Sequence, residues 1–146
     1  MVTPNPDDAG LWEAYRRTVF VATMDGKTVR IHVDRTSPEL DDLLKMRDVT
    51  TWAFITAWNP ASEQLTRAAN DARHERLKEE LSRLKLQAFE GQGEPTGSDW
   101  APERSLLVAG ISVPDGVRLG RRYGQIAIVV GGVGGEARLL KCAPDA

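Results

Sequence analysis

The sequence has no long apolar run. No stretch of the 146 residues approaches the roughly 20 consecutive apolar residues that a membrane-spanning helix needs. The first eight residues, Met1 to Asp8, contain neither the basic start nor the apolar run of a signal peptide. We therefore expect no membrane segment, no export and a cytoplasmic location.

Cysteine and net charge are also scarce. The lone cysteine, Cys142, cannot form an internal disulfide and has no metal-ligand set around it, which fits a reducing compartment. A net charge of −2 provides no overall field that would attract nucleic acid or an anionic membrane. The composition therefore argues against a nucleic-acid partner and a membrane partner, and leaves only local basic patches as a basis for nucleic-acid binding.

The length and the composition are those of one globular unit. A chain of 146 residues is near the usual size of a single domain, and 41% hydrophobic with 27% charged residues argues against wholesale disorder. There is no internal repeat and no low-complexity tract. We therefore predict one domain over residues 1–146.

Patterns along the chain predict both helices and strands. Two β-rich runs flank Asp25-Gly26, a pair that suits a tight hairpin turn, and Thr51 to Ala57 is apolar on both alternating faces, as in a strand covered on both sides. The predicted strands are 18–24, 27–34, 51–57, 105–111, 126–130 and 136–141, and the predicted helices are 7–17, 36–46, 62–85 and 114–123.

These elements predict an α+β fold with α/β-like character. It is a single mixed β-sheet of five or six strands, with the long helix at 62–85 packed on one face and the strand order open. The segment 91–102, rich in glycine and proline, is expected to form a long loop anchored by Trp100. The hydroxyl of Thr36 or Ser37 is expected to cap the second helix.

The segment from Ile55 to Ser62 is the first candidate site. A buried strand is predicted to end there and the long helix to begin, and ligands in open α/β sheets collect beyond strand ends, where helix N-termini bind anions. Trp58, Asn59 and Ser62 are the candidate residues. The alternative is that Asn59 or Ser62 only caps the helix and Pro60 sets the turn, which requires no ligand.

The long helix contributes two further candidates, Asn70 and Arg73. Asn70 falls on the stripe formed by Leu77, Leu81 and Leu84, and an unpaired buried amide would cost on the order of 1 to 3 kcal/mol. Its partner is expected to be either a backbone group of the Trp58-Asn59 turn or a ligand.

Polar residues also open two predicted strands. Glu103 and Ser105 follow the loop at 91–102, and Gln125 follows Gly124. An antiparallel arrangement would bring these strand starts close to Asn59, whereas a parallel arrangement would separate them, and the sequence does not distinguish the two.

Known catalytic and metal-binding motifs are absent. His32 and His74 have no nearby metal-ligand pattern and are expected to be solvated, so we predict no metal site and identify no cofactor. The glycines at 131–135 follow a strand without opening a helix and are expected to form a turn.

The positions of several of these residues resemble a known family. They are the string Trp52-Ala-Phe-Ile-Thr-Ala-Trp-Asn-Pro60, then Asn70, Leu77, Trp100, Glu103, Ser105 and Leu106, then Gly124-Gln125 with Ala127 to Val129. Together they resemble a bacterial family catalogued as domain of unknown function 3293. The resemblance implies a small cytoplasmic α+β protein and points to Asn59, Asn70, Glu103 and Gln125, without implying a substrate or a catalytic role.

Three functions remain open from the sequence. The first is binding of a small polar or nucleotide-like ligand by Trp58, Asn59, Ser62, Asn70, Arg73, Glu103 and Gln125, with catalysis undecided. The second is a non-enzymatic interaction module or homodimer without a ligand site, which predicts a contiguous apolar surface patch. The third is nucleic-acid binding through Arg104, Arg118, Arg121 and Arg122.

Overall fold

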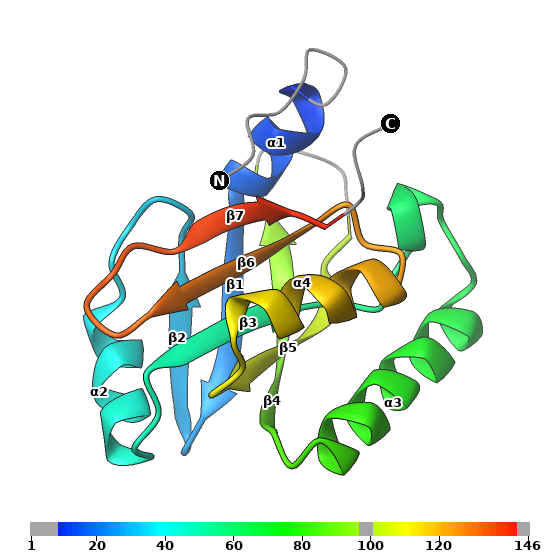
Figure 1. The fold of residues 1–146 in the computed structure, drawn as a ribbon. Helices are drawn as coiled ribbons and strands as arrows, with labels where there is room; N and C mark the ends of the chain where they lie inside the picture. Colours follow the sequence, from blue (N-terminus) through cyan, green and yellow to red (C-terminus); the bar gives the residue numbers. More distant parts are fainter. Residues whose placement is uncertain (1–8, 97–100, 143–146) are drawn as a thin grey trace.

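The chain folds into one seven-stranded antiparallel sheet with helices on both faces (Figure 1). The computed structural model describes residues 9–96 and 101–142, without the side chains of residues 9, 11 and 62. The strands are β1 (Thr18–Met24), β2 (Lys27–Ile31), β3 (Thr51–Ile55), β4 (Gln87–Pro95), β5 (Glu103–Ala109), β6 (Ala127–Gly132) and β7 (Arg138–Lys141). The helices are α1 (Ala9–Arg16), α2 (Pro38–Met46), α3 (Arg67–Arg83) and α4 (Val113–Arg122).

The prediction of a mixed sheet of five or six strands is wrong in two respects. The strand order is β2-β1-β4-β5-β3-β6-β7, and all neighbouring strands pair antiparallel. The hairpin prediction is confirmed, since Asp25 and Gly26 both have positive φ between β1 and β2. No helix in the described ranges is long and apolar enough to cross a membrane.

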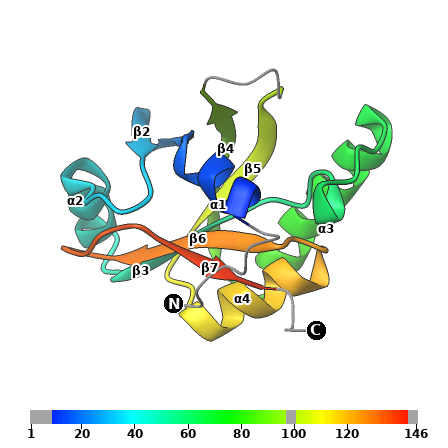
Figure 2. The same cartoon turned by 90° about the horizontal axis from the view of Figure 1, so that it is seen from above.

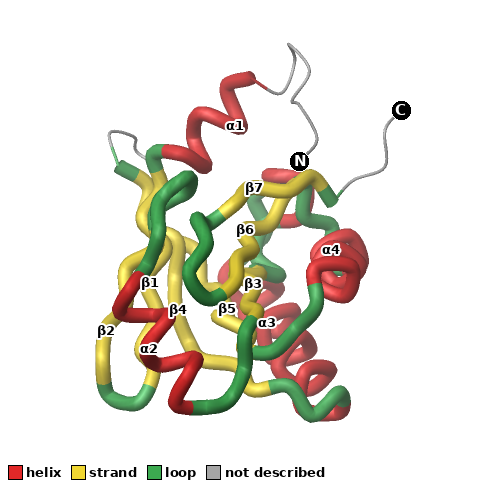
Figure 3. Tube along the Cα trace, turned by 60° about the vertical axis from the view of Figure 1, so that its left-hand side comes forward, coloured by secondary structure: helices red, strands yellow, loops and turns green. Residues whose placement is uncertain are grey.

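The sheet is curled into a half-barrel (Figure 2). Isolated bridges join Val33 to Ala137 and Thr36 to Glu136. The segment that follows the edge strand β2 therefore contacts the segment that precedes the other edge strand, β7. One buried cluster fills the inside of the curl and includes Trp12 of α1 and Leu40 of α2. A second cluster lies between the outer face and α3 and α4, and Figure 3 shows α2 on one side of the sheet and α3 and α4 on the other.

Strand β3 separates these two cores. Its residues Trp52 and Phe54 belong to the inner cluster, whereas Ala53 and Ile55 belong to the outer cluster. This alternation confirms the prediction of a strand covered on both sides. Because β5 and β6 both pair antiparallel with β3, the carboxyl end of β3 lies beside the starts of those two strands.

The predicted loop at 91–102 is wrong, because residues 91–95 belong to β4. Its glycines serve close packing rather than a turn: a Cβ on Gly91 would collide with the Val21 carbonyl oxygen and lie 3.0 Å from Phe54 Cζ. A Cβ on Gly93 would lie 3.6 Å from the Phe20 ring. Trp100, predicted to anchor the loop, lies outside the described residues.

Helix α3 is shorter than predicted and buries a different set of side chains. It begins at Arg67 because the Thr66 hydroxyl caps it by accepting from the Ala69 N–H at 3.2 Å. Leu84, expected in the core, is 54% exposed, because it follows the last helical residue.

His74 was expected to be solvated, and that prediction is wrong. The side chain is 0% exposed, and its Nε2 lies 2.9 Å from Oε1 of Glu90 on β4. Ser37 also departs from expectation, because its side chain makes no capping hydrogen bond to α2.

Replacing Gly91 by alanine is expected to destabilise the protein by about 1–3 kcal/mol, since β1 and β4 would have to move apart around the new methyl group. Urea unfolding of the variant measures this change. Gly10→Ala is the matched control: Gly10 lies in α1 with nothing within 4 Å of its Cβ position, so it should gain about 0.5–1 kcal/mol. Equal effects of the two substitutions would contradict the packing argument.

Candidate functional site

The antiparallel order brings the predicted polar residues to one place, at the carboxyl end of β3. Asn59 Nδ2 donates to Glu103 Oε2 at 3.0 Å, across from the end of β3 to the start of β5. Gln125 Nε2 donates to the Trp58 carbonyl oxygen at 3.0 Å, from the start of β6. The antiparallel pairing, which the sequence could not distinguish from a parallel one, therefore brings Glu103 and Gln125 close to the Trp58-Asn59 turn.

Asn59 and Asn70 form a reciprocal pair. The Asn59 backbone N–H donates to Asn70 Oδ1 at 2.9 Å, and Asn70 Nδ2 donates to Asn59 Oδ1 at 2.8 Å. Asn59 Oδ1 also accepts from the Leu65 N–H at 3.0 Å, which closes the connection between β3 and α3. Asn70 is 1% exposed. Of the two partners expected for this buried amide, a backbone group of the Trp58-Asn59 turn is present, namely the N–H of Asn59.

The backbone of Asn59 explains the choice of residue. Its φ of 44° and ψ of 68° lie in the left-handed region, which asparagine tolerates better than most residues. Residues 60–62 then form a 3-10 turn, and α3 begins only at Arg67. Neither Asn59 nor Ser62 therefore caps α3, and the side chain of Ser62 lies outside the described part.

Arg73 connects the turn to the end of α4. Its Nε donates to the Ala57 carbonyl oxygen at 2.7 Å, and its Nη2 donates to the Tyr123 carbonyl oxygen. The next residue, Gly124, has a φ of 73° and its carbonyl oxygen accepts from the Ala61 N–H at 2.7 Å. The guanidinium therefore donates hydrogen bonds to backbone carbonyls just beyond the ends of β3 and α4.

Glu103 differs from its polar neighbours because burial disfavours its charge and the hydrogen bond from Asn59 offsets only part of that cost. The side chain alternates with those of β5 that face the outer core, and so lies on the inner side with Leu107. Burial raises the pKa of its carboxyl group, and the hydrogen bond from Asn59 opposes that rise without cancelling it. Glu103 is thus a half-buried acid whose ionisation is less favourable than that of a solvated glutamate.

Tyr15 of α1 is a candidate that sequence reasoning missed. Burial raises the pKa of its hydroxyl, and the negative charge of Glu103 raises it further. The hydroxyl therefore stays protonated at neutral pH. The only sequence signal was a polar-tipped aromatic residue on the apolar stripe of the first helix.

The polar side chains at this end of β3 are of two kinds: those that hold the connection in place through hydrogen bonds, and Glu103, which can accept a further hydrogen bond. Asn59, Asn70, Arg73 and Gln125 bond to one another and to backbone groups, and Asn59 also donates to Glu103. Among the residues that the structure describes, Asn59 Nδ2 is the one donor to Glu103, and it bonds to Oε2, so Oε1 has no described donor. Within the described ranges, no group of three or more histidine, cysteine, aspartate and glutamate residues could hold a metal ion.

Replacing Asn70 by alanine is expected to lower the free energy of unfolding by about 1–3 kcal/mol, because the buried N–H of Asn59 loses its acceptor. Urea unfolding measures the loss. Gln64→Ala removes an exposed amide from the same connection and should change stability by less than about 0.5 kcal/mol. An Asn70→Ala variant as stable as the Gln64→Ala control would refute the bracing role.

A comparison with known protein families finds a match that covers this region. A family model described as protein of unknown function (DUF3293) matches residues 55–128, just over half of the 146 residues. The match runs from the last residue of β3 into β6 and includes Asn59, Asn70, Glu103 and Gln125. No curated protein and no solved structure matches the chain significantly. The resemblance seen in the sequence is confirmed, and the chain belongs to the DUF3293 family.

Proposed function

We propose that the protein binds a small polar ligand at the carboxyl end of β3, with Glu103 as the residue that contacts it. The observation that carries this proposal is the half-buried Glu103 carboxyl group, whose raised pKa reflects a charge that burial disfavours. A carboxylate kept in such an environment costs stability, and such groups are concentrated at binding and catalytic sites. The surrounding amides hold it in place through Asn59.

The ligand group that faces Glu103 is a hydrogen-bond donor. An ammonium, an amidinium or the N–H edge of a base would supply the positive charge or the protons that the carboxylate lacks. Tyr15 offers a protonated hydroxyl whose pKa is raised by burial and by the charge of Glu103, and we propose it as a second contact. For a nucleotide-like ligand, the base edge is therefore the part that would meet Glu103.

A phosphate group is less well matched to this turn. The N–H groups of Asn59, Ala61 and Leu65 already donate to protein acceptors, and two nitrogens of Arg73 donate to carbonyl oxygens. An anion would have to displace these bonds. Among the sequence candidates, we therefore assign Trp58, Asn59, Asn70, Arg73 and Gln125 to positioning and Glu103 to ligand contact.

The interaction-module alternative has less support. The exposed large hydrophobic residues in the described ranges are Met46 at 78% and Leu84 at 54%, and they belong to different regions, at the ends of α2 and α3 (Figure 1). They do not form the contiguous patch that such a module would present. A cytoplasmic location remains part of the proposal, supported by the lone, buried thiol of Cys142.

A thermal-shift screen tests the ligand proposal. Primary amines, amidines and nucleosides should include compounds that raise the melting temperature of the wild type, since a ligand that binds only the folded state stabilises it. Glu103→Gln should abolish that rise, whereas Glu63→Gln, which changes an exposed acid near the same turn, should retain it. A rise that survives Glu103→Gln, or appears only with phosphates, would contradict the assignment.

Glu103→Gln is also expected to make the ligand-free protein more stable at pH 7, by on the order of 2 °C in melting temperature. Glutamine keeps an acceptor for Asn59 without a charge. Because the folded-state pKa of Glu103 is raised, the stability contributed by its protonated form is complete below the unfolded pKa and is lost as the pH rises through the folded pKa.

The difference between wild type and Glu103→Gln should therefore shrink as the pH falls through the raised folded-state pKa, and the change should be complete below the ordinary glutamate pKa of about 4.3. Melting temperatures measured from pH 3 to pH 8, a range of about five units around that value, give the profile. A variant that is less stable than the wild type at pH 7 would show that the charge of Glu103 is stabilising.

A further inference from the structure

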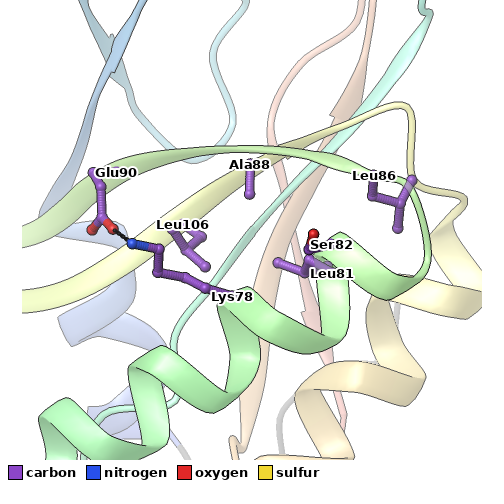
Figure 4. A pocket seen from close by; sticks show the side chains of 7 residues that line it. All are labelled: Lys78, Leu81, Ser82, Leu86, Ala88, Glu90 and Leu106. Carbon is purple, nitrogen blue, oxygen red and sulfur yellow. Dashed lines mark ion pairs between the residues drawn. The ribbon is translucent and has the colours of Figure 1, made fainter.

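A groove lies on the outer face of the sheet, between α3 and the strands β4 and β5 (Figure 4). Its volume is about 290 Å³, just below the range for small-molecule pockets, roughly 300–1,000 Å³. It is separate from Glu103, which faces the inner side. The lining residues are Lys78, Leu81, Ser82, Leu86, Ala88, Glu90 and Leu106.

The floor and one end of the groove are apolar. Leu81 of α3 and Leu106 of β5 belong to the outer core, and Ala88 and Leu86 pack against that core while remaining partly accessible. Figure 4 shows Ala88 and Leu106 between Leu86 at one end and Glu90 at the other. An aliphatic chain laid along this floor would lose contact with water.

The opposite end carries an ion pair. Lys78 Nζ lies 3.0 Å from Glu90 Oε2, and the two side chains are 41% and 46% exposed. Glu90 has two other partners, because Arg104 Nη2 lies 3.3 Å and His74 Nε2 lies 2.9 Å from its Oε1. Lys78 has only a weaker second contact in the described residues, Glu75 at 3.8 Å.

This asymmetry determines which ion can be released. If the pair opens, Glu90 keeps Arg104 and His74, whereas the ammonium of Lys78 is left beside an apolar groove with a distant carboxylate. A solvent-exposed pair of this kind contributes little stability, so exchanging Glu90 for another carboxylate costs little.

We propose that this groove binds a small aliphatic carboxylate, with its chain against the partly accessible Leu86 and Ala88, above the buried Leu81 and Leu106, and its head group on Lys78 in place of Glu90. The cation at one end and the apolar floor match the two halves of such a ligand. This site is independent of the proposed function at Glu103, so either one stands if the other fails.

Proton NMR titration of the full chain with sodium octanoate tests the proposal. The chain has two histidines, so the ring signal of His74, which contacts Glu90, reports on the groove, and that of His32, which follows β2 at the far edge of the sheet, serves as the internal control. Octanoate should move the His74 signal saturably at millimolar concentration and leave the His32 signal in place. Octylammonium, which has the same chain and the opposite charge, should bind at least about tenfold more weakly.

Variants locate the binding. Lys78→Met should weaken octanoate binding by about tenfold or more, whereas Lys45→Met, which removes an exposed lysine from α2, should leave it unchanged. Ala88→Leu should block the groove while keeping an apolar side chain in place. Equal binding of octanoate and octylammonium, unchanged affinity in Lys78→Met, or no saturable movement of the His74 signal would each overturn the proposal.

Discussion

The reciprocal hydrogen bonds between Asn59 and Asn70 hold the chain where it leaves the central strand and turns toward α3. Asn59 adopts a left-handed backbone conformation there. Its side-chain oxygen also accepts from the Leu65 N–H, so Asn59 joins the beginning of the connection between β3 and α3 to its end. The same side chain donates to Glu103 across the sheet. The positions of α3, the connection and the acid of β5 therefore depend on this pair.

The polar groups around the turn divide by how well they are satisfied. The amides, Arg73 and Gln125 exchange hydrogen bonds with one another and with backbone carbonyls, so burying them costs little net free energy. Glu103 is different, because its charge is desolvated and only partly compensated. A stable scaffold that carries one disfavoured charge is the pattern expected of a binding site, and this contrast is the basis of the proposed function.

Local patterns predicted much of the fold. Asp25-Gly26 indicated the hairpin, the apolar faces of residues 51–57 indicated the two-sided strand β3, and Gly124 indicated the end of α4, where its φ is 73°. These features depend on residues close in sequence.

The strand β4 was missed because Gly91 and Gly93 serve packing against Phe54 and Phe20, which belong to other strands. The burial of His74 was missed for the same reason, since its partner Glu90 lies on that strand. The meeting of Asn59 with Glu103 required β3 to lie between β5 and β6, a non-local arrangement that residue patterns do not encode.

Backbone amide hydrogen exchange at Asn59 and Leu65 tests the central claim most directly. The Asn59 N–H is bonded to Asn70 Oδ1 and the Leu65 N–H to Asn59 Oδ1, although both residues lie outside regular helices and strands. If the pair holds the connection, both amides should be protected in the native state nearly as strongly as amides of β3. Exchange of either amide at the rate of the exposed amide of Gln64 would show that the pair does not constrain the chain.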